Sequence, residues 1–374
     1  MKIVIDDKIP FIHDVFEPYA EVIYCKGSSI NKELVADADA LIVRTRTKCN
    51  KSLLEGSSVK IVASATIGFD HIDTAWCESA GIKWTNAPGC NSGSVKQYIT
   101  ASLFYLAAKH SLDLRSLTLG VIGVGNVGSK VVASAKAIGM NVLQNDPPRS
   151  RKEGPAGFVS LEKIFAESDI ITIHVPYTKE GIDRTHHLIN SGNLCNLKQG
   201  CYLFNSSRGE VVDNKALLEA LENGQVAGTV LDVWEGEPDA DRRLIARADI
   251  STPHIAGYSV DGKANGTIKA VHEVSSVLGL PLLDWEPSSL PLPENPEIDL
   301  TGAAQSCSAL ELAGKAVMAT YPILQDNNIF KDNPEKFESL RDNYRKRREF
   351  SSYTVITDNK ECSAIVTRLG FNVK

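Results

Sequence analysis

The feature that most constrains the fold is a glycine-rich turn directly after a short apolar run. The run covers residues 117–122, and the turn reads Gly-x-Gly-x-x-Gly at Gly123, Gly125 and Gly128. Gly123 permits a tight turn, Gly125 lets an anion approach the backbone, and Gly128 lets a helix pack closely on the strand. This strand, turn and helix order is typical of a dinucleotide-binding βαβ unit, in which pyrophosphate meets the N-terminal amides of the helix.

A carboxylate for the adenosine ribose follows at Asp146, at the end of the next predicted strand, 141–144. It lies 18 residues after Gly128, close to the spacing of about 20 residues that the pattern leads us to expect. A carboxylate there repels the 2′-phosphate of NADP, so the sequence predicts NAD; nearby Arg149 favours NADP, and Asp146 has the alternative role of opening the Asp-Pro-Pro turn. The predicted cofactor contacts of this region are Gly123, Gly125, Asn126, Val127, Gly128 and Asp146.

Short aliphatic runs separated by helix-length spacers predict an α/β chain with parallel sheets. A chain of 374 residues is also too long for one ordinary core. A dense turn cluster at 86–93 divides the runs into two series and is followed by a predicted helix from Ser94. The predicted strands are 3–5, 40–43 and 60–63 in the first series, and 117–122, 141–144, 170–174, 201–205 and 229–232 in the second.

The chain changes character after Leu280-Pro281, and a proline-rich stretch runs from Pro287 to Pro296. The tail beyond it is predicted to be a small α+β module with a helix at 308–321 and strands at 353–356 and 363–367. It has no phosphate loop or nucleophile motif, so its first interpretation is assembly into a homodimer. The basic run Arg345–Arg348 suggests cations that reach a partner subunit's cleft and help hold phosphate; the alternative is a solvated helix face.

Composition narrows the partners and the compartment. The formal net charge is −6, from 46 acidic and 40 basic residues, which offers no broad basic field for a nucleic acid. No apolar stretch approaches the roughly 20 residues that cross a bilayer. The eight cysteines are scattered without Cys-x-x-Cys spacing, so we expect reduced thiols, no metal site and a cytoplasmic protein.

Three candidate catalytic residues follow strands of the second series. Arg208, Glu237 and His254 suit a carboxylate clamp, an orienting carboxylate and a proton acceptor, which oxidation of a 2-hydroxy acid requires. Taken singly, each has an ordinary interpretation as a surface ion pair, a solvated acid or a loop histidine. Their combined order gives the pattern its specificity.

Together with the glycine turn, these residues resemble the D-isomer-specific 2-hydroxyacid dehydrogenases. The matching segments are Asn205-Ser206-Ser207-Arg208-Gly209, residues 231–238 and residues 252–257. The resemblance covers roughly residues 1–280. It implies that His254 is the general acid/base, that Glu237 pairs with it, and that Arg208 binds and polarises the substrate. It further implies cofactor contacts at Ser206, Ser207, Arg208, Asp232 and Gly257.

The resemblance also implies a domain plan. A Rossmann-type doubly wound domain would cover 94–255, a discontinuous flavodoxin-like substrate domain 1–93 plus 256–280, and a C-terminal dimerisation domain 281–374, with a cleft that closes between the first two. Two departures are Val95-Lys96-Gln97, where the family often has Val-Ala-Glu, and Ser206-Ser207, where Ala or Thr is common. Neither removes a group that the reaction requires.

The substrate is predicted to be a small phosphorylated 2-hydroxy acid. Residues 65–73 resemble the family loop whose amides hold the substrate carboxylate. The cationic loop directly after the buried strand 40–43 suits a phosphate, and its alternative interpretation is an exposed basic loop. The predicted substrate contacts are Arg44, Thr45, Arg46, Thr66, Ile67, Gly68 and Tyr258. Alternatives are another dehydrogenase of the family, such as one acting on 3-phosphoglycerate, and a non-catalytic NAD-sensing scaffold, against which the presence of all three catalytic candidates argues.

Overall fold

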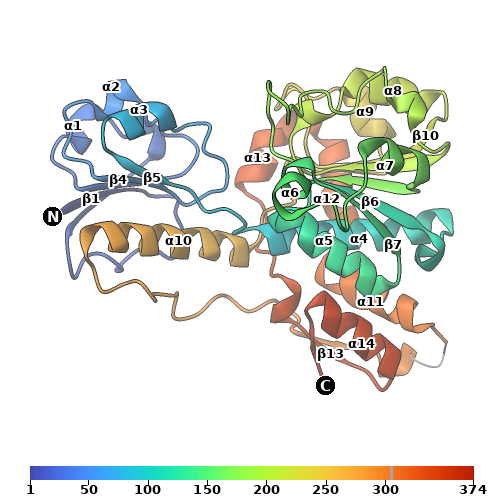
Figure 1. The fold of residues 1–374 in the computed structure, drawn as a ribbon. Helices are drawn as coiled ribbons and strands as arrows, with labels where there is room; N and C mark the ends of the chain where they lie inside the picture. Colours follow the sequence, from blue (N-terminus) through green and yellow to red (C-terminus); the bar gives the residue numbers. More distant parts are fainter. Residues whose placement is uncertain (304–305) are drawn as a thin grey trace. The chain divides into compact units, whose positions relative to one another are not determined.

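Figure 1 shows the computed structural model, which describes residues 1–303 and 306–374. The chain divides into two compact units, one formed by Met1–Asn91 with Ser259–Pro291 and the other by Ser92–Tyr258 with Leu292–Lys374. Both are built on parallel sheets covered by helices, so the predicted α/β class is confirmed. Residues 292–374, here called the C-terminal module, belong to the second unit; their treatment as a separate domain from residue 281 stays a prediction.

The first unit contains a five-stranded parallel sheet in the order β2-β1-β3-β4-β5, the flavodoxin-type order. Helix α10 covers one face through Ala270, Val271 and Val274, and short helices cover the other. The strands are β1 (Lys2–Asp6), β2 (Glu21–Cys25), β3 (Ala40–Val43), β4 (Ile61–Ser64) and β5 (Lys83–Thr85). The helices are α1 (Lys32–Val35), α2 (Lys51–Leu54), α3 (Thr74–Ser79) and α10 (Val260–Leu278), with a 3-10 turn at Gly27–Ser29.

The second unit contains a six-stranded parallel sheet in the order β11-β10-β9-β8-β6-β7. Its strands are β6 (Thr118–Ile122), β7 (Asn141–Asn145), β8 (Ile170–Ile173), β9 (Cys201–Asn205), β10 (Val226–Leu231) and β11 (Ile250–Ser251). Because β7 lies on one side of β6 and β8 on the other, the direction in which successive strands are added reverses at β6. Ligands of doubly wound sheets bind at the carboxyl ends of the strands at such a reversal.

Helices cover both faces of this sheet, with α4 and α5 on one face and α7 and α8 on the other. The helices before the C-terminal module are α4 (Ser92–His110), α5 (Asn126–Ile138), α6 (Pro147–Glu153), α7 (Leu161–Glu167), α8 (Asn214–Glu222) and α9 (Arg242–Arg247). Short 3-10 turns lie at Leu114–Ser116, Leu194–Asn196 and Gly209–Val211.

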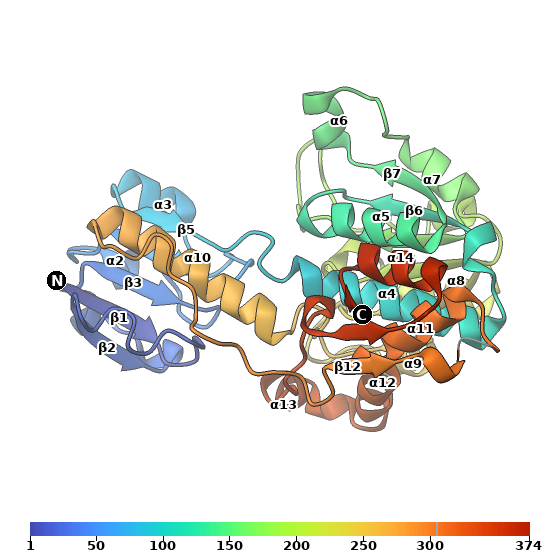
Figure 2. The ribbon, with the colours of Figure 1, turned by 90° about the horizontal axis from the view of Figure 1, so that it is seen from below.

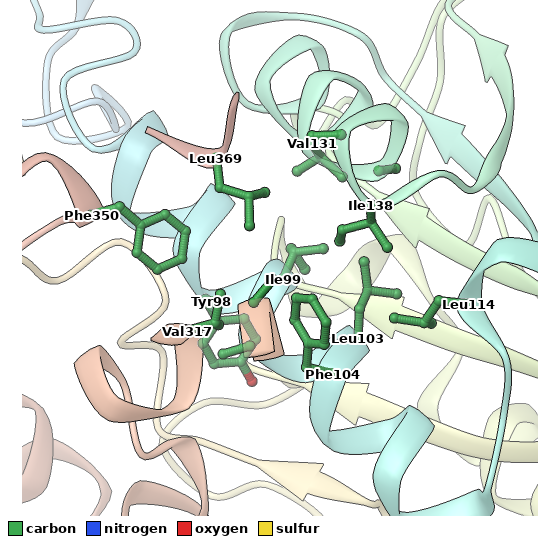
Figure 3. Close-up of a cluster of buried hydrophobic side chains, with 14 of the residues drawn as sticks. Tyr98, Ile99, Leu103, Phe104, Leu114, Val131, Ile138, Val317, Phe350 and Leu369 are labelled. Atoms are coloured by element: carbon green, nitrogen blue, oxygen red, sulfur yellow. The ribbon is translucent and has the colours of Figure 1, made fainter. Parts of the chain in front are cut away.

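The C-terminal module packs its helices α11 and α14 on α4 and α5, as Figures 1 and 2 show. In the shared core, Phe350, Val317 and Leu369 of the module lie against Ile99 and Leu103 of α4 (Figure 3). Its helices are α11 (Ala309–Thr320), α12 (Ile323–Asp332), α13 (Phe337–Asp342) and α14 (Lys360–Leu369). Its parallel sheet, in the order β12-β13-β14, comprises Glu297–Asp299, Thr354–Ile356 and Asn372–Val373, and 3-10 turns lie at Thr301–Ala303, Pro334–Lys336 and Phe350–Ser352.

One predicted element is wrong, since residues 363–367 form part of helix α14 and not a strand. The helix begins after Asn359, whose side chain accepts from the Cys362 amide, and ends at Gly370 in a left-handed conformation. Its buried residues, Cys362, Ile365, Val366 and Leu369, recur at the spacing of one helical face. A short apolar run does not by itself distinguish a buried helix face from a strand.

Candidate active site

The glycine turn after β6 has the shape that the dinucleotide pattern predicts. Gly123 has a φ of +84°, and a Cβ there would lie 2.7 Å from the His174 carbonyl oxygen. At Gly128 a Cβ would lie 2.0 Å from the Gly123 carbonyl oxygen, whereas at Gly125 it would meet no described atom within 4 Å. The protein's own packing therefore requires glycine at positions 123 and 128. Gly125 instead leaves space for a ligand beside the N-terminus of α5.

Asp146 joins this turn to the next strand. One carboxylate oxygen accepts from the Val124 amide at 2.8 Å and the other from the Arg149 amide at 3.0 Å, which caps α6. The Arg149 guanidinium donates to the Val124 carbonyl at 2.6 Å and to both carboxylate oxygens of Glu153. The Arg149 guanidinium is thus already engaged by protein groups, and the Asp146 carboxylate lies at the turn, as the prediction of NAD requires.

Ser206 and Ser207, after β9, differ in how their hydroxyls are used. Ser207 Oγ donates to Asn205 Oδ1 at 2.8 Å. Ser206 Oγ is buried and has no hydrogen-bond partner in the described part of the chain. A buried hydroxyl without a partner is uncommon in a native protein and fits a group that a ligand completes. Together with the open space at Gly125, it shows that these residues fit a bound dinucleotide.

His254 and Glu237 form a hydrogen-bonded pair, with His254 Nδ1 and Glu237 Oε2 2.8 Å apart. Glu237 Oε1 also accepts from the Trp234 amide at 2.9 Å. Burial alone would raise the pKa of Glu237, but the hydrogen bond and charge of His254, with the charge of Arg341, hold that pKa below its ordinary value. The carboxylate is therefore ionised at neutral pH and orients the imidazole through Nδ1.

Asp232 holds the loop that carries this histidine. Its backbone carbonyl accepts from the His254 amide at 2.7 Å, and its carboxylate accepts from the Ile255 amide at 2.8 Å and the Ala256 amide at 2.9 Å. The Thr252 hydroxyl donates to the same carboxylate at 2.7 Å. Burial raises the pKa of Asp232 to about 6 against the lowering effect of these contacts. The hydrogen bonds of Asp232 also hold His254 at a φ of +57°, a left-handed conformation that few non-glycine residues adopt.

The three catalytic candidates follow three adjacent strands of one parallel sheet. Arg208 comes after β9, Glu237 after β10 and His254 after β11, so all three lie at the same edge. Arg208 Nη1 donates to the Ser207 carbonyl at 2.8 Å, and in the described part of the chain no carboxylate pairs with its guanidinium. That guanidinium is available for the carboxylate of a ligand. Gly257, another predicted cofactor contact, lies in the loop between β11 and α10.

Of two arginines of the C-terminal module, sequence reasoning missed Arg341 and gave Arg347 the wrong surroundings. Arg347 is only 2% exposed, and it donates to the carbonyls of Ala256 at 2.6 Å and Tyr258 at 3.0 Å. Arg341 Nε donates to the Tyr258 hydroxyl at 2.9 Å. Both therefore contact residues directly after His254. The only sequence signal was the basic run 345–348, and neither of its two interpretations holds for Arg347, which is buried within its own chain.

The remaining predicted substrate contacts belong to the first unit. Thr66 Oγ1 lies 2.8 Å from Ser64 Oγ and donates to the Gly68 carbonyl, while the Ile67 carbonyl accepts from the Asn86 side chain at 2.7 Å. This shapes residues 66–68 into a compact loop. Arg44, Thr45 and Arg46 follow β3, and Arg46 lines a cavity of about 430 Å³ with Lys32 and Lys48. The loop after β3 is thus cationic, as a phosphate requires.

Comparison with known proteins identifies the fold and the family. Residues 95–256 match the NAD-binding domain of the D-isomer-specific 2-hydroxyacid dehydrogenases, and residues 289–370 match a domain of unknown function. The chain is 30% identical to the D-lactate dehydrogenase of Aquifex aeolicus in complex with NAD and lactic acid, with a TM-score of 0.61, over 75% of this chain and 96% of that one.

Full-length relatives include the C-terminal module. The chain is 49% identical to erythronate-4-phosphate dehydrogenase of Bacteroides thetaiotaomicron over 95% of this chain and 99% of the relative. It is 41% identical to the Shigella flexneri enzyme of the same name over 100% of this chain and 98% of the relative. Within residues 1–303 and 306–374, no helix has the length and apolar character of a membrane span, and no cluster of candidate metal ligands occurs.

Proposed function

The chain belongs to the erythronate-4-phosphate dehydrogenases of the D-isomer-specific 2-hydroxyacid dehydrogenase family, and we propose that it oxidises 4-phospho-D-erythronate with NAD. The product is 2-oxo-3-hydroxy-4-phosphobutanoate, in pyridoxal phosphate biosynthesis. The observation that carries this proposal is the 2.8 Å pair of His254 and Glu237 in a chain that matches these enzymes from end to end. A pure NAD sensor has no need of that pair.

In the proposed mechanism, His254 Nε2 accepts the proton of the C2 hydroxyl, because Nδ1 faces Glu237 and carries the other hydrogen. The negative charge of Glu237 then stabilises the imidazolium that forms. Arg208 binds the substrate carboxylate and polarises the reacting oxygen. Bound NAD supplies the acceptor for the hydride that leaves C2.

The other predicted contacts complete the proposal. The turn at 123–128, Asp146, Ser206, Ser207, Asp232 and Gly257 contact the cofactor. The loop 66–68 binds the substrate carboxylate, the loop 44–46 binds phosphate, and Tyr258 contacts the distal end of the substrate. A homodimer formed through the C-terminal module and a cytoplasmic location are also proposed; the eight free cysteines support the latter.

The test is NADH formation by the purified chain with 4-phospho-D-erythronate, D-3-phosphoglycerate and D-lactate. We expect the highest kcat/KM with 4-phospho-D-erythronate, and higher activity with NAD than with NADP. Equal or higher activity with 3-phosphoglycerate would assign a different substrate within the family. NAD binding without turnover of any 2-hydroxy acid would instead support the scaffold alternative.

A further inference from the structure

We propose that Arg341 of the C-terminal module binds the phosphate group of the substrate. The inference rests on the proposed function, in which the substrate is a phosphorylated 2-hydroxy acid. It gives the domain of unknown function at residues 289–370 a direct part in substrate recognition, in addition to any role in assembly.

The first support is the geometry of Arg341 and Tyr258. Arg341 lies in α13, and its Nε donates to the Tyr258 hydroxyl at 2.9 Å, with the guanidinium carbon 5.7 Å from the centre of the same ring. Tyr258 follows His254 by four residues in the loop between β11 and α10, here called the catalytic loop. In the described part of the chain, neither Nη1 nor Nη2 of Arg341 has a hydrogen-bond or ion-pair partner. These two nitrogens form the parallel donor pair that matches two phosphate oxygens.

The second support is the charge around the catalytic pair. Arg341 is close enough to Glu237 to help lower its pKa, so the guanidinium lies within electrostatic reach of the carboxylate that orients His254. A substrate phosphate brought near that carboxylate would be repelled without a cation between or beside them. Arg341 supplies this cation from the same end of the unit, whereas Arg347 is buried and already donates to loop carbonyls.

The third support is the way in which α13 packs against the protein. Phe337, the first residue of the helix, is 2% exposed and its ring lies 5.6 Å from that of Phe330, which lies 6.0 Å from the Trp234 ring. The Trp234 amide in turn donates to Glu237. A chain of ring contacts, one tilted and one edge-to-face, thus connects the helix that carries Arg341 to the segment that carries Glu237, which holds both charges in preorganised positions.

The test compares 4-phospho-D-erythronate with unphosphorylated D-erythronate in Arg341→Gln and in Arg368→Gln, an exposed arginine on α14 of the same module. We expect Arg341→Gln to lower the ratio of kcat/KM for the phosphorylated over the unphosphorylated substrate by about 10- to 100-fold, mainly through KM. Arg368→Gln should leave the ratio at the wild-type value. An Arg341→Gln variant that loses activity equally with both substrates would overturn the proposal, because Arg341 would then make no distinction between the phosphorylated and the unphosphorylated substrate.

A binding measurement separates this inference from the proposed function. Titration of the NAD-bound protein with inorganic phosphate should give a dissociation constant that rises about 10-fold or more in Arg341→Gln. If the wild type fails to oxidise 4-phospho-D-erythronate, the proposed function fails, and this titration alone decides the inference. Unchanged phosphate affinity in the variant would overturn it, whatever the substrate proves to be.

Discussion

Two loops at the carboxyl edge of the six-stranded sheet, the turn after β6 and the loop after β11, differ in how far their polar groups are satisfied by the protein itself. The turn after β6 leaves open space at Gly125, and the Ser206 hydroxyl, after β9, has no partner among the described residues. In the loop after β11, the Asp232 carboxylate accepts three hydrogen bonds, and Arg347 donates to the carbonyls of Ile255, Ala256 and Tyr258. The proposed nucleotide end thus leaves space and a hydroxyl for a ligand, whereas the proposed catalytic end is held by hydrogen bonds within the protein.

The difference has a physical reason. A general base needs a fixed tautomer and position before substrate arrives, so its loop must be held by protein contacts. Those contacts keep His254 in a left-handed backbone conformation that costs free energy. A dinucleotide brings its own charges and hydroxyls, so the turn needs only space and correctly directed amides.

The largest expected effect comes from removing His254, the proposed base. His254→Ala should lower kcat by about 10²- to 10⁴-fold, the range for losing a general base. The NAD dissociation constant should change little, because the glycine turn makes none of its contacts through His254. Steady-state kinetics and calorimetric NAD titration check both halves. Turnover close to wild type would remove His254 from the mechanism, and a matched His272→Ala on α10 controls for histidine loss elsewhere.

The next effect concerns the arginine that holds the catalytic loop. Arg347→Met keeps the side-chain length but removes the hydrogen bonds that Arg347 donates to the carbonyls of Ala256 and Tyr258. We expect the free energy of unfolding to fall by about 2–4 kcal/mol and kcat to fall, with NAD affinity retained. Arg368→Met, exposed on α14, should change stability by no more than about 0.5 kcal/mol. An equal loss of NAD affinity and turnover in Arg347→Met would contradict the independence of the two loops.

A smaller effect distinguishes the two roles of glycine in the turn. Gly128→Ala places a Cβ against the Gly123 carbonyl and should lower the free energy of unfolding by about 1–3 kcal/mol. Gly125→Ala meets no described atom within 4 Å, so stability should be nearly unchanged while the NAD dissociation constant rises about 10-fold or more. Thermal unfolding with and without NAD measures both. A stable Gly128→Ala variant would show that the turn adjusts its backbone.

The comparison also explains what the sequence could predict. The glycine turn, Arg208, Glu237 and His254 have local signals, because each follows a strand and belongs to a short recognisable segment. The fold class follows from the same alternation of strands and helices and is confirmed. The roles of the individual site residues stay predictions until the variants are measured.

The rest depends on contacts between residues far apart in the chain. Arg341 meets Tyr258 across 83 positions and Arg347 meets Ala256 across 91, and no periodicity relates such pairs. Burial of a charged side chain is also against ordinary expectation, so the basic run 345–348 suggested a surface. The strand predicted at 363–367 failed because burial against α5 selects the helical spacing of its apolar residues.

The smallest expected effect tests whether an unpartnered hydroxyl awaits the ligand. Ser206→Ala removes no hydrogen bond within the described residues, so stability should change by no more than about 0.5 kcal/mol, while the NAD dissociation constant rises about 3- to 10-fold. Ser207→Ala is the matched control, because its hydroxyl donates to Asn205 and its loss should lower the free energy of unfolding by about 1 kcal/mol. Calorimetric NAD titration and denaturant unfolding should therefore show the larger loss of NAD affinity in Ser206→Ala and the larger loss of stability in Ser207→Ala. If Ser206→Ala destabilised the protein and kept its NAD affinity, the nucleotide end would be as self-contained as the catalytic loop, and the contrast between the two would disappear.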